Sequence, residues 1–320
     1  MNITDTRIVF MGTPEFATGC LKNLISHHYN VVGVVTVADK PAGRGKKISQ
    51  SSIKKYAQEQ NLPILQPTNL KNEEFLKELK ELRADLQIVV AFRMLPKVIW
   101  EMPSLGTFNL HASLLPHYRG AAPINWAIIN GDEESGVTTF MIDEKIDTGE
   151  ILLQETVSIS KNMTAGELHD QLLNIGAKLI LKTIDGIVQK KIQPKPQPTH
   201  KTFKKAPKIF KDQCKINWND PLDNIHNFIR GLTPYPGAWT ELKLNDKVYS
   251  FRILRAEKIF QKHHHKTGII LIDKKTFVVA VKGGFINIIL GQIQGKKTQS
   301  SIDLINGTSN YNSITIYKNC

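Results

Sequence analysis

Short, continuously apolar segments alternate with amphipathic ones along the first half of the chain, and this alternation constrains the fold more than any other feature. The apolar runs, rich in β-branched residues, are 7–12 (RIVFMG), 31–38 (VVGVVTVA) and 85–92 (DLQIVVAF). Between them, 72–83 (NEEFLKELKELR) has helical apolar spacing behind a capping Asn72. Such strands, separated by helices, are typical of a parallel sheet covered on both faces. We therefore expect an α/β fold with a doubly wound, mostly parallel, Rossmann-like sheet.

The turn after the first predicted strand reads MGTPEF at residues 11–16. A dinucleotide-binding fold carries G-x-G-x-x-G at this position, whereas here Gly12 stands alone. We therefore expect no nicotinamide cofactor. Ligands of doubly wound sheets still bind at the carboxyl ends of the strands, so any site should lie there.

Residues 136–159 predict two strands around an acidic turn, which would add antiparallel strands to the sheet. Thr164 and Glu167 then have the spacing of a capping box and predict the start of a long helix. Together with the preceding elements, these segments define a predicted first domain over residues 1–189.

The rest of the chain has a different pattern. Residues 190–207 are rich in Pro and Lys, have no apolar period, and predict a semi-extended linker. Residues 208–320 contain short alternating strands with Gly and Asp turns, which favour a small β-barrel or sandwich as a second domain.

The charge of the chain is divided as sharply as its pattern. Residues 1–189 hold 19 Lys and Arg against 21 Asp and Glu, a net of −2, while residues 190–320 hold 23 against 8, a net of +15. A solvated lysine-rich surface would account for this excess, but so sharp a division favours a polyanionic partner, most commonly nucleic acid.

Cysteine usage and hydropathy bear on the setting of the protein. Cys20, Cys214 and Cys320 are odd in number and far apart, so we expect neither a disulfide framework nor a zinc site. The consecutive residues His263, His264 and His265 predict a solvated loop rather than a metal site. No apolar run suits a membrane span and no signal peptide is expected, so a cytoplasmic location fits best.

The segment TFNLHASLLPHYRGAAP (107–123) starts as a strand with Asn109 and His111 on one face. A lone buried His is usually structural, but here an Asn shares its face, and Asp147 follows in the acidic turn DEKIDTGE. An amide can stabilise an oxyanion, a His can move a proton near neutral pH, and a carboxylate can orient that His. The pattern predicts acyl transfer to an amine.

A basic, Gly-rich segment, DKPAGRGKK (39–47), follows the second strand of the predicted sheet. Its composition predicts a loop that exposes Arg44, Lys46 and Lys47. The segment could be only a solvated loop, or it could border the same edge of the sheet as the candidate site.

Five motifs of the chain resemble, in order and spacing, those of the methionyl-tRNA formyltransferases. They are MGTPEFA, DKPAGRGKK, FNLHASLLPHYRGAAPINWAI, DTGEIL and IRGLTPYPGAWT. NLHASLLPHYRG alone would indicate only the wider superfamily that uses 10-formyltetrahydrofolate. One departure is Arg93 in VVAFRMLP, where members of the family commonly carry Gly.

The resemblance implies transfer of a formyl group from 10-formyltetrahydrofolate to the α-amine of methionine on initiator tRNA, without a metal. Asn109, His111 and Asp147 would be catalytic. The resemblance implies folate binding by four consecutive residues, Ser113, Leu114, Leu115 and Pro116. The loop at 39–48, with Arg44, would enter the acceptor stem of the tRNA, and an OB-like C-terminal barrel would hold its outside. We expect a monomer.

Two other functions remain open from the sequence. A formyltransferase acting on a nucleotide sugar or another small amine needs only the first domain, and the basic second part argues against it. A non-enzymatic RNA-binding protein on the same fold is the other, and Asn109, His111 and Asp147 argue against that one.

Overall fold

The computed structural model describes residues 2–42, 47–198, 202–308 and 313–317, with the backbone alone at 40–42, 47–49 and 308. The chain forms two compact units. The first combines Met1–Gly120, Gly136–Val157 and His169–Lys205, and the second combines Ala121–Ser135, Ser158–Leu168 and Ala206–Cys320. The domain boundaries expected from the sequence, 1–189 and 208–320, stay a prediction.

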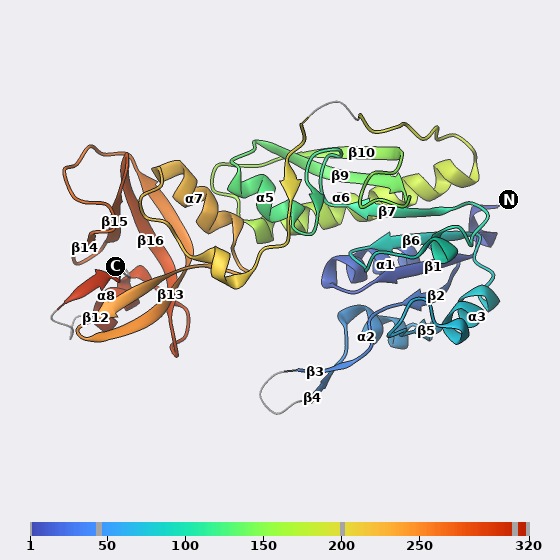
Figure 1. Cartoon of the computed structure of the whole chain (residues 1–320), viewed down its shortest axis with the longest axis horizontal. Coiled ribbons are helices and arrows are strands. Elements are labelled where there is room, and N and C mark those ends of the chain that lie inside the picture. The colour runs from blue at the N-terminus through green and yellow to red at the C-terminus, as the bar shows by residue number, and fades with distance from the viewer. Residues whose placement is uncertain (1, 43–46, 199–201, 309–312, 318–320) are drawn as a thin grey trace. The chain divides into compact units, whose positions relative to one another are not determined.

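A seven-stranded sheet forms the centre of the first unit, in the order β10-β9-β7-β6-β1-β2-β5 (Figure 1). The strands β5, β2, β1, β6 and β7 pair in parallel, and β9 adds to β7 in the antiparallel sense. The strands are β1 (Ile8–Gly12), β2 (Val31–Val35), β5 (Ile64–Leu65), β6 (Leu86–Val90), β7 (Thr107–His111), β9 (Glu134–Met141) and β10 (Ile151–Ser158). The predicted doubly wound, mostly parallel sheet and its antiparallel addition are confirmed.

Helices cover both faces of this sheet. They are α1 (Glu15–Ser26), α2 (Ser52–Glu59), α3 (Glu73–Glu81), α4 (Lys97–Trp100) and α6 (Ala165–Val188), with a 3-10 turn η1 (Ile3–Asp5) before β1. The side chain of Asn23 on α1 donates to the carbonyl of Ala177 on α6, at 3.0 Å, so these two helices share one face. On the other face, Phe75 and Leu79 of α3 pack with Val89 of β6 in one buried cluster.

Local capping follows the sequence at two of these helices. Asn72 accepts a hydrogen bond from the backbone N–H of Phe75 at 3.0 Å, as predicted for an N-cap. Thr164 and Glu167 form the predicted capping box, because the N–H of Thr164 donates to the Glu167 carboxylate and the N–H of Glu167 donates to the Thr164 hydroxyl.

The segment after β2 differs from the loop that the sequence predicts at 39–47. Its ends pair in the antiparallel sense as β3 (Lys40–Ala42) and β4 (Lys47–Ser49). Residues 43–46 lie outside the described part of the chain. The composition of the segment indicated its turn but could not indicate the pairing of its ends.

The second unit is built on a nearly closed, barrel-like antiparallel sheet in the order β14-β15-β16-β13-β12-β18, with β17 beside β16 (Figure 1). Its strands are β12 (Ala238–Leu244), β13 (Lys247–Ile259), β14 (Ile270–Ile272), β15 (Phe277–Val281), β16 (Gly284–Ile293), β17 (Gln299–Ser300) and β18 (Ile314–Ile316). Irregular register near Arg255 in β13 supports the strong bend that a small barrel needs. The predicted small β-barrel is confirmed.

Short helices complete the second unit: α5 (Pro123–Ile129), η2 (Lys211–Cys214), α7 (Leu222–Gly231) and α8 (Ser301–Thr308).

Two further short strands, β8 (Arg119–Gly120) and β11 (Lys205–Ala206), pair with each other. In the described part of the chain, no helix is both long enough and apolar enough to cross a membrane.

Candidate active site

The candidate site starts at the carboxyl end of β7. Leu110 of β7 contacts the position of Gly176 on α6, so by strand alternation Asn109 and His111 face the opposite side of the sheet. Asn109 is in register with Val89 of β6, which confirms that side. The predicted common face of Asn109 and His111 is therefore present at the edge where ligands of such sheets bind.

His111 is buried and has one ring nitrogen in a firm hydrogen bond. Its Nε2 lies 2.8 Å from the carbonyl oxygen of Tyr118. Because a carbonyl can only accept, Nε2 carries the hydrogen and donates it. In the neutral ring Nδ1 is then left with its lone pair, which makes it the nitrogen that can exchange a proton.

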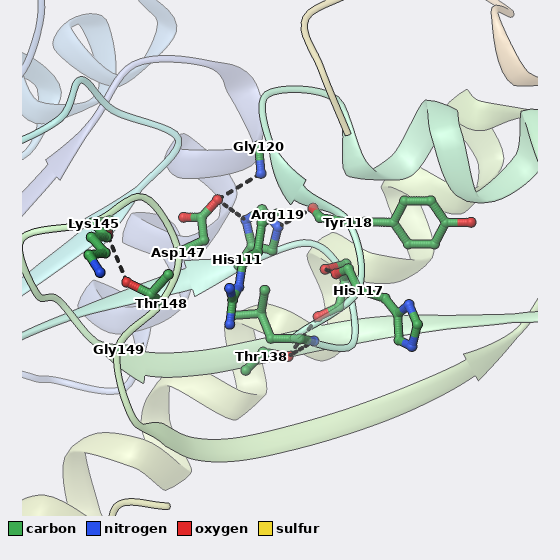
Figure 2. A network of polar contacts seen from close by, with 12 residues as sticks. His111, His117, Tyr118, Arg119, Gly120, Thr138, Lys145, Asp147, Thr148 and Gly149 are labelled. Atoms are coloured by element: carbon green, nitrogen blue, oxygen red, sulfur yellow. Dashed lines mark hydrogen bonds and ion pairs between the residues drawn. The ribbon is translucent and has the colours of Figure 1, made fainter. Parts of the chain in front are cut away.

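Asp147 faces that second nitrogen. Figure 2 shows the ring of His111 between the carboxylate of Asp147 and the carbonyl of Tyr118. The distance from Nδ1 to the Asp147 Oδ2 is 3.8 Å, too long for a good hydrogen bond. The same Oδ2 accepts the backbone N–H of Gly120 at 2.9 Å. The Asp147 carboxylate is therefore held in place beside the second ring nitrogen of His111.

The turn that presents Asp147 is sterically tight. Asp147 itself has a φ of 55°, in the left-handed region, which Asp tolerates better than most residues. Two residues later, a Cβ on Gly149 would lie 1.6 Å from the carbonyl oxygen of Met141 at the end of β9. Only glycine fits there, and this fixes the path of the turn relative to β9.

Asn109 differs from His111 in having a side chain that is free to bind a ligand. It is half-buried, and its amide has no hydrogen-bond partner among the residues that the structure describes. A neutral amide of this kind beside an imidazole can donate to an oxygen on which negative charge develops.

The segment Ser113–Pro116 forms a turn directly after β7. Ser113 is fully buried and donates to the carbonyl of His117 at 2.7 Å, while its own carbonyl accepts the hydroxyl of Thr138 at 2.6 Å. The backbone N–H of Leu115 also donates to Thr138, at 3.1 Å, and Leu115 is buried. The half-buried members of the turn are the other two residues, Leu114 and Pro116.

The basic residues predicted for nucleic acid have no described side chains. Arg44 and Lys46 lie outside the described residues, and Lys47 is described only as backbone in β4. Arg93 is described, and its guanidinium donates to the carbonyls of Pro67 and Thr68, at 2.7 and 3.1 Å. It thereby joins the segments that follow β5 and β6.

Of the three consecutive histidines, His263 differs from the solvated loop that the sequence predicts. His263 is half-buried, its Nε2 lies 2.9 Å from the carbonyls of Val281 and Gly284, and its ring packs on Phe285 with centroids 4.4 Å apart. His264 and His265 are exposed. Within the described ranges, no cluster of three His, Cys, Asp or Glu side chains could hold a metal ion.

Several groups that hold the site were not found from the sequence. Two are backbone groups, the carbonyl of Tyr118 and the N–H of Gly120, and composition carries no signal for either. Another is Gln197, whose amide contacts the turn of Asp147. It lies between two prolines in the predicted linker, and nothing in that pattern distinguishes it.

Residues 6–184 match the formyl transferase family, and residues 208–309 match the formyl transferase C-terminal domain. The chain belongs to the formyl transferase family.

Relatives in this family are similar over nearly their whole length. One is a methionyl-tRNA formyltransferase of Flavobacterium johnsoniae, 51% identical over 311 residues that cover 97% of this chain and 99% of the relative. Another carries the same name in Bacteroides thetaiotaomicron and is 50% identical over 312 residues, with 96% and 97% covered. The family resemblance that the motifs suggested from the sequence is thus confirmed.

A solved structure in the family has the same fold. It is the sugar 3N-formyl transferase WlaRD, in the presence of dTDP and 5-N-formyl-tetrahydrofolate. It aligns with a TM-score of 0.65 at 22% identity, over 93% of this chain and all of that one. At this identity the likeness establishes the common formyl transferase fold.

Proposed function

We propose that this formyl transferase moves the formyl group of 10-formyltetrahydrofolate to the α-amino group of methionyl initiator tRNA, giving N-formylmethionyl-tRNA for translation initiation. The relatives' name, at about half identity over almost the entire chain, supports the substrate pair. The observation that carries the chemistry is buried His111 beside half-buried Asp147, on the face that also holds Asn109, whose amide has no partner among the described residues.

The reaction needs a proton acceptor, because an ammonium cannot attack a formyl carbon. In this proposal Nδ1 of neutral His111 takes a proton from the incoming ammonium, and Asp147 stabilises the imidazolium that results. The fixed Nε2–H bond to Tyr118 supports this assignment, since it leaves Nδ1 as the accepting atom. After the transfer, Nδ1–H of the imidazolium is available to donate a hydrogen bond to the formyl oxygen.

The amine nitrogen then forms a bond to the formyl carbon, and the C=O electron pair moves onto the oxygen. Asn109 donates to this oxyanion, which is the role its free amide suits. When the oxyanion collapses, the bond from carbon to N10 of the folate breaks. N10 gains one proton and the new amide nitrogen loses one, while the proton that His111 took from the ammonium is released to solvent, so the products are formyl-methionyl-tRNA, tetrahydrofolate and one proton.

The folate co-substrate would bind next to Asn109, at the turn Ser113–Pro116. Leu114 and Pro116 would supply the apolar wall, because Ser113 and Leu115 are buried and engaged within the turn. The role of Ser113 in this proposal is therefore to shape the turn, with its hydroxyl directed to its own loop.

The nucleic acid would be bound mainly by residues 190–320, whose net charge is +15. The segment 39–48, with Arg44, Lys46 and Lys47, would enter the end of the acceptor stem. A monomer in the cytoplasm belongs to the same proposal.

The decisive test compares two acceptors with 10-formyltetrahydrofolate: methionyl initiator tRNA and a nucleotide-linked amino sugar. Formylation of the tRNA alone is expected, and formylation of the sugar alone would support the small-amine alternative, which shares the fold. His111→Ala should lower kcat about 10²–10⁴-fold and leave tRNA binding nearly unchanged. Asp147→Asn should also lower kcat, since an amide does not favour imidazolium.

A further inference from the structure

Gln197 is a buried polar residue in a segment that is otherwise open to solvent. Only 7% of its surface is exposed, whereas Pro194, Lys195, Pro196 and Pro198 around it are all exposed. The segment is held against the start of β10, because Lys195 and Ile151 exchange backbone hydrogen bonds of 2.8 and 2.9 Å. A side chain this polar is buried only when its hydrogen bonds are satisfied.

The amide of Gln197 uses its full capacity. Its Nε2 donates to the backbone carbonyls of Asp147 and Gly149, at 3.0 and 2.8 Å. Its Oε1 accepts from both Nε and Nη2 of Arg119, at 3.2 and 2.5 Å. Two donors and two acceptor positions are all that an amide offers, so none is left for a ligand.

The two segments that Gln197 joins are the two that hold the His111–Asp147 pair. On one side, Arg119 lies between Tyr118, whose carbonyl accepts Nε2–H of His111, and Gly120, whose N–H donates to Asp147. On the other side, the side chain of Gln197 donates a hydrogen bond to the backbone carbonyl of Asp147 itself. The distance between imidazole and carboxylate therefore depends on how these two turns are joined.

We propose that Gln197 is a positioning residue for the reaction, which sets the place of the Asp147 carboxylate relative to His111 through the carbonyls of the 147–149 turn. This inference rests on the proposed function for its rate readout. It also gives one residue of the mostly exposed segment 190–198, Gln197, a role in supporting the first unit's candidate active site. Misplacement of a reacting group by about 1 Å can cost roughly 10²-fold in rate, so loss of the hydrogen bonds of Gln197 should lower the rate measurably.

The sharpest variant is Gln197→Glu. A carboxylate of the same shape still accepts from Arg119, but it cannot donate to the two carbonyls and repels them instead. Gln193→Glu is the matched control, since it makes the same chemical change at an exposed position of the same segment. Gln197→Met is a second variant of similar size, without donors and without a new charge, in case the Glu variant does not fold.

Two readouts are expected to move. The kcat for formylation should fall about 10–100-fold in Gln197→Glu and Gln197→Met, while KM for each substrate changes by less than about threefold. Hydrogen exchange should become faster in the peptide that contains residues 143–149. Gln193→Glu should match the unmodified protein in both. A merely structural role would lower thermal stability without this separation of kcat from KM.

A double variant tests the route of the effect. If Gln197 acts through Asp147, adding Gln197→Glu to Asp147→Asn should lower kcat by less than about threefold more. Full additivity would overturn the inference, as would wild-type kcat and unchanged exchange in both single variants. If the unmodified protein formylates no methionyl-tRNA, the proposed function fails, and the exchange measurement alone decides whether Gln197 holds the turn.

Discussion

Gly149→Ala should test how strictly the turn of Asp147 is fixed. The added Cβ would lie 1.6 Å from the carbonyl oxygen of Met141 and 2.8 Å from its carbonyl carbon. Real Cβ atoms stay beyond 3.0 Å of such neighbours, so the turn must move by roughly 1.4 Å, the difference between 3.0 and 1.6 Å. Since the obstacle is backbone, no side-chain rotation can relieve it.

A shift of that size has two effects. It stretches the 2.9 Å bond from Gly120 to the Asp147 carboxylate and changes the 3.8 Å separation from His111. We expect kcat to fall about 10²-fold, because the reacting groups lose their alignment. Overpacking of this kind also costs about 1–3 kcal/mol in the free energy of unfolding.

The assay is formylation of methionyl initiator tRNA at saturating folate, with thermal unfolding measured alongside. Gly307→Ala is the matched control, because a Cβ there meets only the side-chain nitrogen of Gln299, at 3.8 Å. It should leave kcat unchanged. If Gly149→Ala keeps both the wild-type kcat and the wild-type melting temperature, the steric account of the turn is wrong.

Three further outcomes are expected. Asn109→Ala should lower kcat about 10²–10³-fold with little change in thermal stability, because its amide has no described partner to lose. Burial lowers the pKa of His226 from 6.5 to about 4, so the unfolded chain binds the proton more readily than the folded one. The free energy of unfolding therefore falls as the pH drops from 6.5 toward 4. In urea unfolding, the unmodified protein should lose roughly 2 kcal/mol more between pH 7 and pH 5 than His226→Gln does. Arg44→Lys should cut activity on initiator tRNA severely while Lys46→Arg is tolerated, which separates base reading from simple charge. If Arg44→Lys and Lys46→Arg are equally active, the segment 39–48 contributes only positive charge to tRNA binding.

Local patterns predicted the elements of this fold because their causes are local. The cap at Asn72 joins residues three apart, and so does the capping box of Thr164 and Glu167. The parallel sheet was equally accessible, since strands buried on both faces must be apolar throughout. Where two segments pair without an apolar pattern, as β3 and β4 do, the sequence predicted only a loop.

The side chains that we propose to react were predictable from the sequence, whereas the groups that support them were not. Asn109 and His111 stand on one face by strand alternation alone, and the family motifs point to Asp147. The contact between Arg119 and Gln197 joins residues 78 positions apart. It depends on where an exposed, proline-rich segment returns to the sheet, and no periodicity in that segment encodes its path.

The site also depends on backbone conformations that a sequence states only indirectly. Tyr118 and Asp147 both have left-handed backbones, with φ of 61° and 55°, and Gly120 has a φ of 122° that only glycine adopts readily. These conformations direct the carbonyl of Tyr118 to His111 and the N–H of Gly120 to Asp147. The tautomer of His111 is therefore fixed by a group that no side-chain substitution removes. A substitution that changes the turn, such as a larger residue at Gly120, should then alter the chemistry of His111 without touching the ring.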